Sequence, residues 1–269
     1  MRYKQRRGSY SQNFFRSPKL VRKLIRYSSI DKNDIVLEIG AGCGIITQEL
    51  LKIAGKVIAI EVDKKLCLHL KEKFKYAKNL ELIQDNFLNF ELPTYPYKVF
   101  ANIPFIITAD IIRKLTSDDN FREGYLIVQK EAAKKFIGKP YDHQNQMISA
   151  LLKPWFVIGI FWKFKRYDFI PRPNVDCVMI VIKRREEPLV PMTNLQFFRD
   201  FILHIYNGER GASRLETAQL IRRFEKFAKE SEWSQKALIK RKAQKILSEQ
   251  KLLQKIHRTR KDKHWRKFR

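Results

Sequence analysis

Short apolar runs that alternate with segments of helical spacing fill the first two-thirds of the chain. The runs that predict strands are 35–39, 57–60, 80–83, 99–101, 125–128, 157–161 and 178–182. Helical spacing separates the earlier runs, over 45–53, 64–74 and 108–115, and the pair Ser17 and Pro18 predicts the start of one more helix. This alternation predicts a mostly parallel sheet, with the last two runs close enough to form an antiparallel pair at its edge.

Glycines follow the first predicted strand, at Gly40, Gly42 and Gly44. A strand, a glycine-rich turn and a helix open a Rossmann-like unit. The second predicted strand ends at Glu61, about the spacing after Gly40 at which an acidic side chain binds ribose hydroxyls. A tight turn without a ligand and a solvated loop carboxylate would each explain one of these features. The two at this spacing favour a cofactor that contains a nucleoside.

Ligands of such sheets bind at the carboxyl ends of the strands, where Gly40, Glu61, Asp85 and Asn102 all fall. Asp85 can accept a hydrogen bond from the exocyclic amine of an adenine. The glycine pattern lacks the last glycine of the dinucleotide fingerprint, because Ile45 follows Gly44. This shorter loop favours a cofactor without a pyrophosphate, such as S-adenosylmethionine, over a nicotinamide cofactor.

The tetrad Asn102-Ile103-Pro104-Phe105 directly follows the fourth predicted strand. The amide oxygen of Asn102 and a neighbouring backbone carbonyl can accept hydrogen bonds from an exocyclic amine, while the ring of Phe105 can stack on a flat base. A strand-end turn with a core phenylalanine would give the same residues. The position of the tetrad beside the other strand ends favours a clamp for a base.

The pattern of residues changes after residue 185, from alternating strand-like and helical segments to a linker and helical spacing. This change predicts domains at 1–185 and 186–269. Residues 186–191 resemble a linker, and helical spacing follows it. Residues 236–269 contain fourteen Lys or Arg and two acidic residues, with Trp265 as a ring that can stack on a base. The apolar positions that can form one helical stripe there are Ile239, Ala243, Ile246, Leu253 and Ile256. A solvated tail is the alternative to a basic, RNA-binding helix.

A net charge of +27 and a pI of about 10.1 predict a polyanionic partner, with nucleic acid favoured over a membrane surface. No apolar segment is long enough to span a bilayer, and residues 1–8 do not open a secretory signal, so we expect a cytoplasmic protein. The three cysteines and five histidines show no disulfide or metal spacing. We therefore expect no metal site and no membrane partner.

Six motifs occur in order between about residues 5 and 183, and together they resemble the rRNA adenine N6-methyltransferases. These comprise the Erm resistance enzymes and the KsgA-type enzymes of ribosome biogenesis. The motifs are Ser11-Gln12-Asn13-Phe14, residues 37–42, Glu61, Asp85, Asn102-Ile103-Pro104-Phe105 and residues 169–176. The Ser-Gln-Asn-Phe opening and Asn-Ile-Pro, in place of Asn-Leu-Pro, resemble Erm more than KsgA. Phe105, Cys177 and the long basic tail depart from the usual family pattern.

The resemblance implies a Rossmann-like class I methyltransferase of α/β class, with seven strands, mostly parallel with an antiparallel edge, and a small C-terminal helical domain. It implies S-adenosyl-L-methionine as cofactor. The implied cofactor-binding residues are Gln12, Asn13, Phe15, Gly40, Gly42, Glu61, Asp85 and Asn102. The implied catalytic residues are Asn102, Ile103, Pro104 and Phe105, which would hold an adenine for direct methyl transfer without a covalent nucleophile.

The resemblance to Erm implies methylation of 23S rRNA, before full ribosome assembly, and resistance to macrolides, lincosamides and streptogramin B. We expect the enzyme to act as a monomer. A KsgA-type enzyme that acts on 16S rRNA is one alternative. A non-catalytic nucleic-acid-binding protein on a methyltransferase fold is another, and it predicts decay of cofactor motifs that are intact here.

Overall fold

The computed structural model describes residues 13–139 and 147–259, and the side chains of the last helix as far as residue 249. The chain forms two compact units. The first contains residues 1–137 and 156–186, and the second contains residues 138–155 and 187–269.

The first unit contains a seven-stranded sheet with the strand order β4-β3-β2-β5-β6-β9-β7. The strands are β2 (Ile35–Ile39), β3 (Lys56–Ile60), β4 (Leu80–Ile83), β5 (Tyr97–Asn102), β6 (Phe121–Gln129), β7 (Phe156–Lys163) and β9 (Cys177–Arg184). The five strands from β4 to β6 are parallel, whereas β9 is antiparallel to both β6 and β7. The mostly parallel sheet with an antiparallel edge pair is therefore confirmed.

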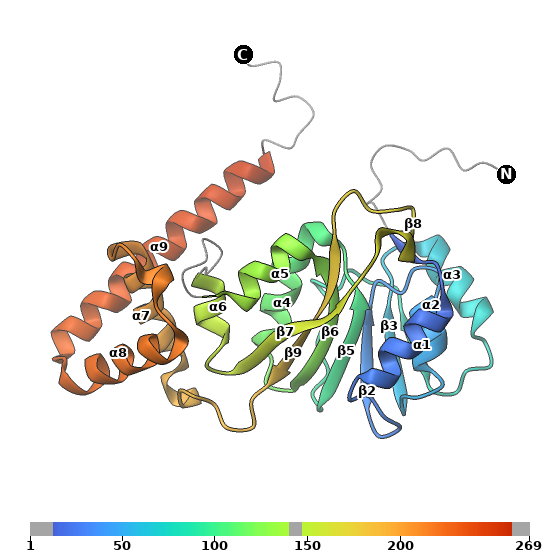
Figure 1. The fold of residues 1–269 in the computed structure, drawn as a ribbon, viewed down its shortest axis with the longest axis horizontal. Helices are drawn as coiled ribbons and strands as arrows, with labels where there is room; N and C mark the ends of the chain where they lie inside the picture. The colour runs from blue at the N-terminus through green and yellow to red at the C-terminus, as the bar shows by residue number, and fades with distance from the viewer. Residues whose placement is uncertain (1–12, 140–146, 260–269) are drawn as a thin grey trace, which may run out of the picture. The chain divides into compact units, whose positions relative to one another are not determined.

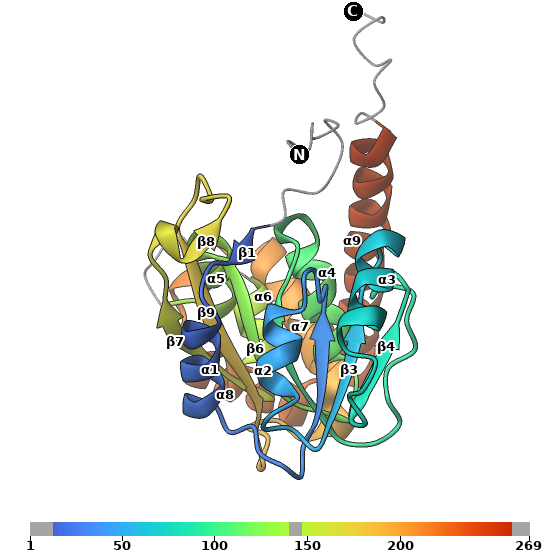
Figure 2. The same cartoon turned by 90° about the vertical axis from the view of Figure 1, so that its right-hand side faces the viewer.

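Helices cover both faces of this sheet (Figures 1 and 2). One face carries α1 (Pro18–Tyr27), α2 (Ile45–Leu50) and α3 (Lys64–Lys73), and the other carries α4 (Thr108–Thr116) and α5 (Lys130–Ile137). Val99, Leu126 and Ile180, in three central strands, each have 0% exposed surface. Because both faces are covered, the strands have near-continuous apolar sequences, which is the pattern that identified them.

Strand β6 begins four residues earlier than its apolar run, and it contains the charged residue Glu123. This carboxylate is 6% exposed and accepts hydrogen bonds from the hydroxyl groups of Ser29 and Tyr125. Hydrogen bonds, one of them from a residue distant in sequence, therefore satisfy a charge that made the segment unlike a buried strand.

A second, two-stranded sheet pairs β1 (Phe14–Phe15) antiparallel with β8 (Phe169–Ile170). The sequence patterns did not predict it, because each strand has only two residues. The short 3-10 helices in the described residues are η1 (Phe105–Ile107), η2 (Arg166–Asp168), η3 (Met192–Asn194) and η4 (Ala212–Arg214).

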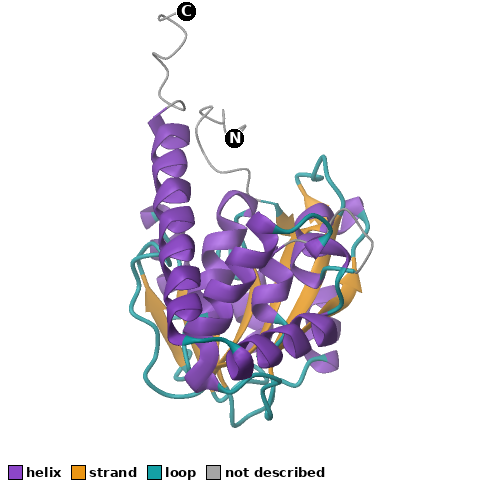
Figure 3. Cartoon of the chain, turned by 90° about the vertical axis from the view of Figure 1, so that its left-hand side faces the viewer, coloured by secondary structure: helices purple, strands orange, loops and turns teal. Residues whose placement is uncertain are grey.

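The second unit is helical, and Figure 3 shows α9 as one continuous helix. Its helices are α6 (Met147–Leu152), α7 (Leu195–Gly208), α8 (Thr217–Glu230) and α9 (Trp233–Thr259). The rings of Phe198 and Phe201 contact Phe224 edge to face, with centroids 5.1 and 5.6 Å apart. In α9, Ile239 and Ala243 are buried, so this part of the basic tail presents an apolar stripe. In the residues that the structure describes, no helix is long and apolar enough to cross a membrane.

Candidate active site at the carboxyl edge of the sheet

The four predicted strand-end residues lie at one edge of the first unit. Strands β4, β3, β2 and β5 are neighbours and run in the same direction, so their carboxyl ends meet there. Gly40 follows β2, Glu61 follows β3, Asp85 follows β4 and Asn102 ends β5. The structure thus brings together the residues that sequence reasoning assigned to one site.

The glycine turn is open at its first glycine and covered at its second. Gly40 has φ +74°, and a Cβ atom added there would meet no atom within 4 Å. A Cβ on Gly42, which has φ +57°, would lie 2.7 Å from the ring of Phe14. Both positive φ values favour glycine. The backbone at Gly40 therefore leaves room for a ligand to approach closely, as a cofactor site at this turn requires.

Glu61 braces the glycine turn from the end of β3. Its side chain is 1% exposed, and its Oε2 accepts a hydrogen bond of 2.8 Å from the backbone N–H of Gly42. Its Oε1 accepts one of 2.9 Å from the N–H of Asp63. A solvated loop carboxylate would not be buried in this way. Each carboxylate oxygen can accept a second hydrogen bond, so Glu61 keeps the capacity to bind ribose hydroxyls.

Glu38 is a further buried carboxylate beneath the same turn, and its sequence position alone assigned it no separate role. It lies in β2 with 0% exposed surface, and its Oε2 accepts a 2.6 Å hydrogen bond from Thr47 Oγ1. Its Oε1 is buried without a hydrogen-bond partner in the described part of the chain. The signal in the sequence was a single charge inside an otherwise apolar strand.

Burial raises the pKa of Glu38 to about 8, although the hydrogen bond from Thr47 opposes this rise. The negative charge of Glu61 also raises it. Glu38 is thus mostly protonated at neutral pH. An unpaired polar atom under the open glycine turn fits a site that receives a polar ligand or a bound water.

The amide of Asn102 is held in one orientation. Its Nδ2 donates a short hydrogen bond to the backbone carbonyl of Asn13, so Oδ1 remains as an acceptor at the end of β5. The side chain of Ile103 is 2% exposed, which leaves its backbone as the group that can meet a substrate. Pro104 precedes η1, and Phe105, its first residue, is partly buried against the core. The tetrad thus forms a strand end and a turn, and it also offers an acceptor and a ring.

The N-terminal residues of the predicted cofactor site differ in where their side chains and backbone groups lie. Asn13 reaches the site through the carbonyl that holds Asn102. Phe15 is 4% exposed and stacks on Phe169 at 5.1 Å, so its role in cofactor binding stays a prediction. Phe14, which had no assigned role, is the ring that lies against the glycine turn. Gln12 lies outside the described residues.

Asp85 is partly buried, and its Oδ1 accepts a 2.6 Å hydrogen bond from the N–H of Asn86. This bond orients the carboxylate and leaves its other oxygen for a donor such as the exocyclic amine of adenine. In the described parts of the chain, no group of three or more His, Cys, Asp or Glu residues could hold a metal ion.

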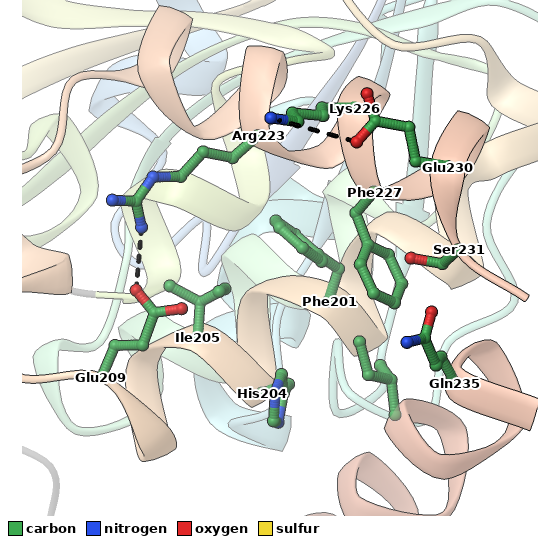
Figure 4. Close-up of a pocket in the computed structure, with 11 residues that line it drawn as sticks. Phe201, His204, Ile205, Glu209, Arg223, Lys226, Phe227, Glu230, Ser231 and Gln235 are labelled. Carbon is green, nitrogen blue, oxygen red and sulfur yellow. Dashed lines mark hydrogen bonds and ion pairs between the residues drawn. The ribbon is translucent and has the colours of Figure 1, made fainter.

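The second unit contains a groove between α7, α8 and α9, shown in Figure 4. The rings of Phe201 and Phe227 form its apolar part, and none of the predicted site residues lines it. Its charged groups already have partners, because Arg223 pairs with Glu209 at 2.8 Å and Lys226 lies 3.9 Å from a neighbouring glutamate. The groove is therefore a less suitable site for the predicted chemistry than the edge of the sheet.

The raised pKa of Glu38 predicts a pH-dependent stability. Between the ordinary carboxyl pKa of 4.5 and about 8, the folded chain keeps a proton that the unfolded chain has lost. Folding then takes up a proton, so the free energy of unfolding falls as pH rises through this window. We expect Glu38→Gln to remove this part of the fall, which is worth a few kcal/mol across the window.

Urea unfolding of both proteins, from about pH 5 to about pH 8, measures the effect. The difference between the wild-type and variant free energies is the relevant quantity, because it cancels the titration of all other groups. Parallel profiles for the two proteins would show that Glu38 titrates normally.

Comparison with known proteins identifies the family. The family model for ribosomal RNA adenine dimethylase matches residues 3–256. An rRNA adenine N-6-methyltransferase of Lysinibacillus sphaericus is 38% identical over 176 residues, which are 65% of this chain and 70% of that protein. A probable ribosomal RNA small subunit methyltransferase A of Methanococcus aeolicus is 35% identical over 198 residues, or 73% of each chain.

Two solved structures share the fold. The 23S rRNA methyltransferase ErmE matches with a TM-score of 0.70 and 24% identity, over 81% of this chain and 100% of that one. A dimethyladenosine transferase from Plasmodium falciparum matches with a TM-score of 0.67 and 28% identity, over 73% and 72% of the two chains. These matches confirm the predicted class I methyltransferase fold. The chain belongs to the ribosomal RNA adenine dimethylase family, that is, to the rRNA adenine N6-methyltransferases.

Proposed function

We propose that this enzyme methylates N6 of an adenine in 23S rRNA, at the macrolide-binding region, and so confers resistance to macrolides, lincosamides and streptogramin B. The choice of an Erm-type enzyme over a KsgA-type enzyme rests on two motifs. These are Ser11-Gln12-Asn13-Phe14 and Asn102-Ile103-Pro104, which resemble Erm more than KsgA. In the structure the two motifs are joined, because the amide of Asn102 binds the carbonyl of Asn13. That contact supports a site at this edge of the sheet, and the two motifs are the observation that carries the choice of 23S rRNA.

The carboxyl edge of the sheet fits S-adenosyl-L-methionine as cofactor. The open backbone at Gly40 would face it, Glu61 would accept from the ribose hydroxyls and Asp85 from the adenine amine. Glu38 beneath the turn adds an unpaired polar atom, Oε1. When bound, S-adenosylmethionine supplies a methyl group on a positively charged sulfur, which is an electrophile.

The tetrad at the end of β5 would prepare the adenine. The exocyclic amine of adenine is a poor nucleophile, because its lone pair is delocalised into the ring. Asn102 Oδ1 and the backbone carbonyl of Ile103 would accept hydrogen bonds from its two protons and so direct the lone pair toward the methyl group. The ring of Phe105 would stack on the base and stabilise positive charge that develops on it.

No side chain has to act as a covalent nucleophile in this transfer. Burial raises the pKa of the Cys177 thiol to about 11, so this cysteine stays protonated and unreactive. It lies in β9 within the aromatic and aliphatic core, in agreement with a packing role. Positioning of the adenine and the methyl group, together with electrostatic stabilisation, would therefore account for the rate enhancement, as direct transfer to an amine requires.

A KsgA-type enzyme that methylates 16S rRNA is the second candidate. Relatives with both kinds of name match the chain, at 38% and 35% identity, so the choice depends on the two motifs rather than on overall similarity. A non-catalytic binding protein would not need an intact glycine turn, a buried Glu61 and an oriented Asn102 on one edge.

The target is tested by methyl transfer from labelled S-adenosylmethionine to purified 23S and 16S rRNA, followed by mapping of the labelled nucleotide. We expect label in 23S rRNA, on a single adenine that is unpaired or in a loop, because the base must leave its stack. Label in 16S rRNA alone would favour the KsgA-type enzyme. Absence of label in both would favour the binding protein.

We also propose that residues 186–269 form a region that binds RNA. The described part of α9 buries Ile239 and Ala243 and leaves Arg241 and Lys242 exposed, which separates an apolar face from a basic one. Residues 251–269 add nine Lys or Arg against one acidic residue, Asp262. A strong excess of cations favours binding to phosphates.

Truncation after Gln250 tests this region without removing Ile239 or Ala243. We expect the truncated protein to bind rRNA more weakly and with a smaller dependence on salt. Each phosphate contact that the truncation removes lowers the slope of log affinity against log salt concentration. The measurement is the affinity for rRNA at several salt concentrations. A slope equal to that of the full chain would place the tail away from the RNA.

A further inference from the structure

Lys114 reaches from α4 to a loop on the cofactor edge and binds three of its carbonyl groups. Its Nζ donates hydrogen bonds of 2.7 Å to the carbonyl of Phe87 and 3.1 Å to that of Leu88, and a third to that of Phe90. The same ammonium group lies 5.0 Å from the centre of the Phe87 ring. An ammonium has three donors, and here all three have acceptors.

This loop directly follows Asp85. The carbonyl of Asn86 accepts from the N–H groups of Asn89 and Phe90, at 2.8 and 3.1 Å, and Asn86 Oδ1 accepts from that of Leu88. These bonds close a tight turn, which points several carbonyl groups in one direction. The ammonium group of Lys114 satisfies them where they converge.

The connection that contains the loop has no helix of its own. Residues 84–96, between β4 and β5, contain no helical segment, whereas α2, α3 and α4 connect the other neighbouring parallel strands. A loop without a helix has fewer contacts that fix its backbone. Lys114 supplies such contacts from α4, and Phe87, which is 4% exposed, anchors the loop in the core.

The position of Lys114 is costly for a cation, which argues that it has a specific role. Burial lowers the pKa of the Lys114 ammonium, and Asp85 partly offsets this effect. Lys153, in the second unit, is in a similar environment, because burial also lowers its pKa and its Nζ donates to the carbonyl of Gly138 at 2.6 Å. Gly138 is not a sequence-predicted site residue, so Lys153 serves as a matched control.

We propose that Lys114 is a positioning residue for the adenosine part of the cofactor: it fixes the loop after β4 and thereby holds Asp85 at the place where the adenine amine binds. The proposal rests on the proposed function, because it takes Asp85 as the adenine ligand. A displaced Asp85 would weaken binding of any ligand that contains adenosine. It would not change the groups at the end of β5 that hold the substrate base.

The test compares wild type with Lys114→Met and Lys153→Met, using isothermal titration with S-adenosylhomocysteine. Methionine keeps most of the apolar stem and removes the ammonium group. We expect Lys114→Met to weaken binding about tenfold and Lys153→Met to leave the affinity unchanged. The melting temperature of each variant shows whether the two substitutions destabilise the fold to a similar degree.

A second ligand tests whether the loss of affinity in Lys114→Met arises at the adenosine part of the cofactor. The fragment 5′-methylthioadenosine keeps the adenosine and lacks the amino acid, so its affinity should fall by the same factor in Lys114→Met. Lys114→Arg should recover part of the loss, because a guanidinium group can also donate to several carbonyls. Hydrogen exchange at Leu88, Asn89 and Phe90 should be faster in Lys114→Met than in wild type.

The outcomes separate this proposal from the proposed function. If wild type binds neither ligand, the cofactor assignment is wrong. If wild type binds both ligands and Lys114→Met binds each with the affinity of wild type, the cofactor assignment stands and the positioning role of Lys114 is wrong. Equal losses in Lys114→Met and Lys153→Met would mean that general destabilisation causes the effect, which also overturns the positioning role.

Discussion

The parallel alignment of β4, β3, β2 and β5 is the constraint on which the rest of the site depends. Parallel strands must be covered on both faces, and helices cover both faces of this sheet. Once the strands are parallel and adjacent, their carboxyl ends share one edge. The order of the strands therefore brings Gly40 and Asn102 close together, although they are distant in sequence. No direct contact between the two residues is needed for this.

Side-chain hydrogen bonds to the backbone then set the geometry at that edge. Glu61 holds the N–H of Gly42, Asn102 holds the carbonyl of Asn13, and Lys114 holds the loop beyond Asp85. Each is a polar or charged group that is partly or fully buried, and each fixes a segment of backbone beside the site. Such groups cost free energy when they are unpaired, so loss of one partner displaces the segment that it holds.

Much of the fold could be predicted from sequence, because hydrophobic periodicity reports burial directly. The seven strands and the antiparallel edge pair followed from apolar runs, and the strand-end residues followed from the order of those runs. The β1–β8 pair could not be predicted, since two residues show no period. The start of β6 was missed because the charge of Glu123 is satisfied by Ser29, which is remote in sequence.

The candidate site was predicted in its residue types more completely than in their contacts. Sequence spacing located Glu61 and Asn102, but it could not show that one is bonded to Gly42 and the other to Asn13. The buried Glu38 and the ring of Phe14 were missed as site residues, because burial and ring direction depend on tertiary packing. The role of Phe15 remains a prediction, since its ring is packed on Phe169.

The central claim is that the oriented amide oxygen of Asn102 accepts a hydrogen bond from the adenine amine. It is tested most directly by Asn102→Ala, with single-turnover methyl transfer to purified rRNA measured beside the affinity for S-adenosylhomocysteine. We expect the affinity to stay within a few-fold of wild type while the rate of transfer falls at least about a hundredfold. Equal rates of transfer in the two proteins would contradict the claim.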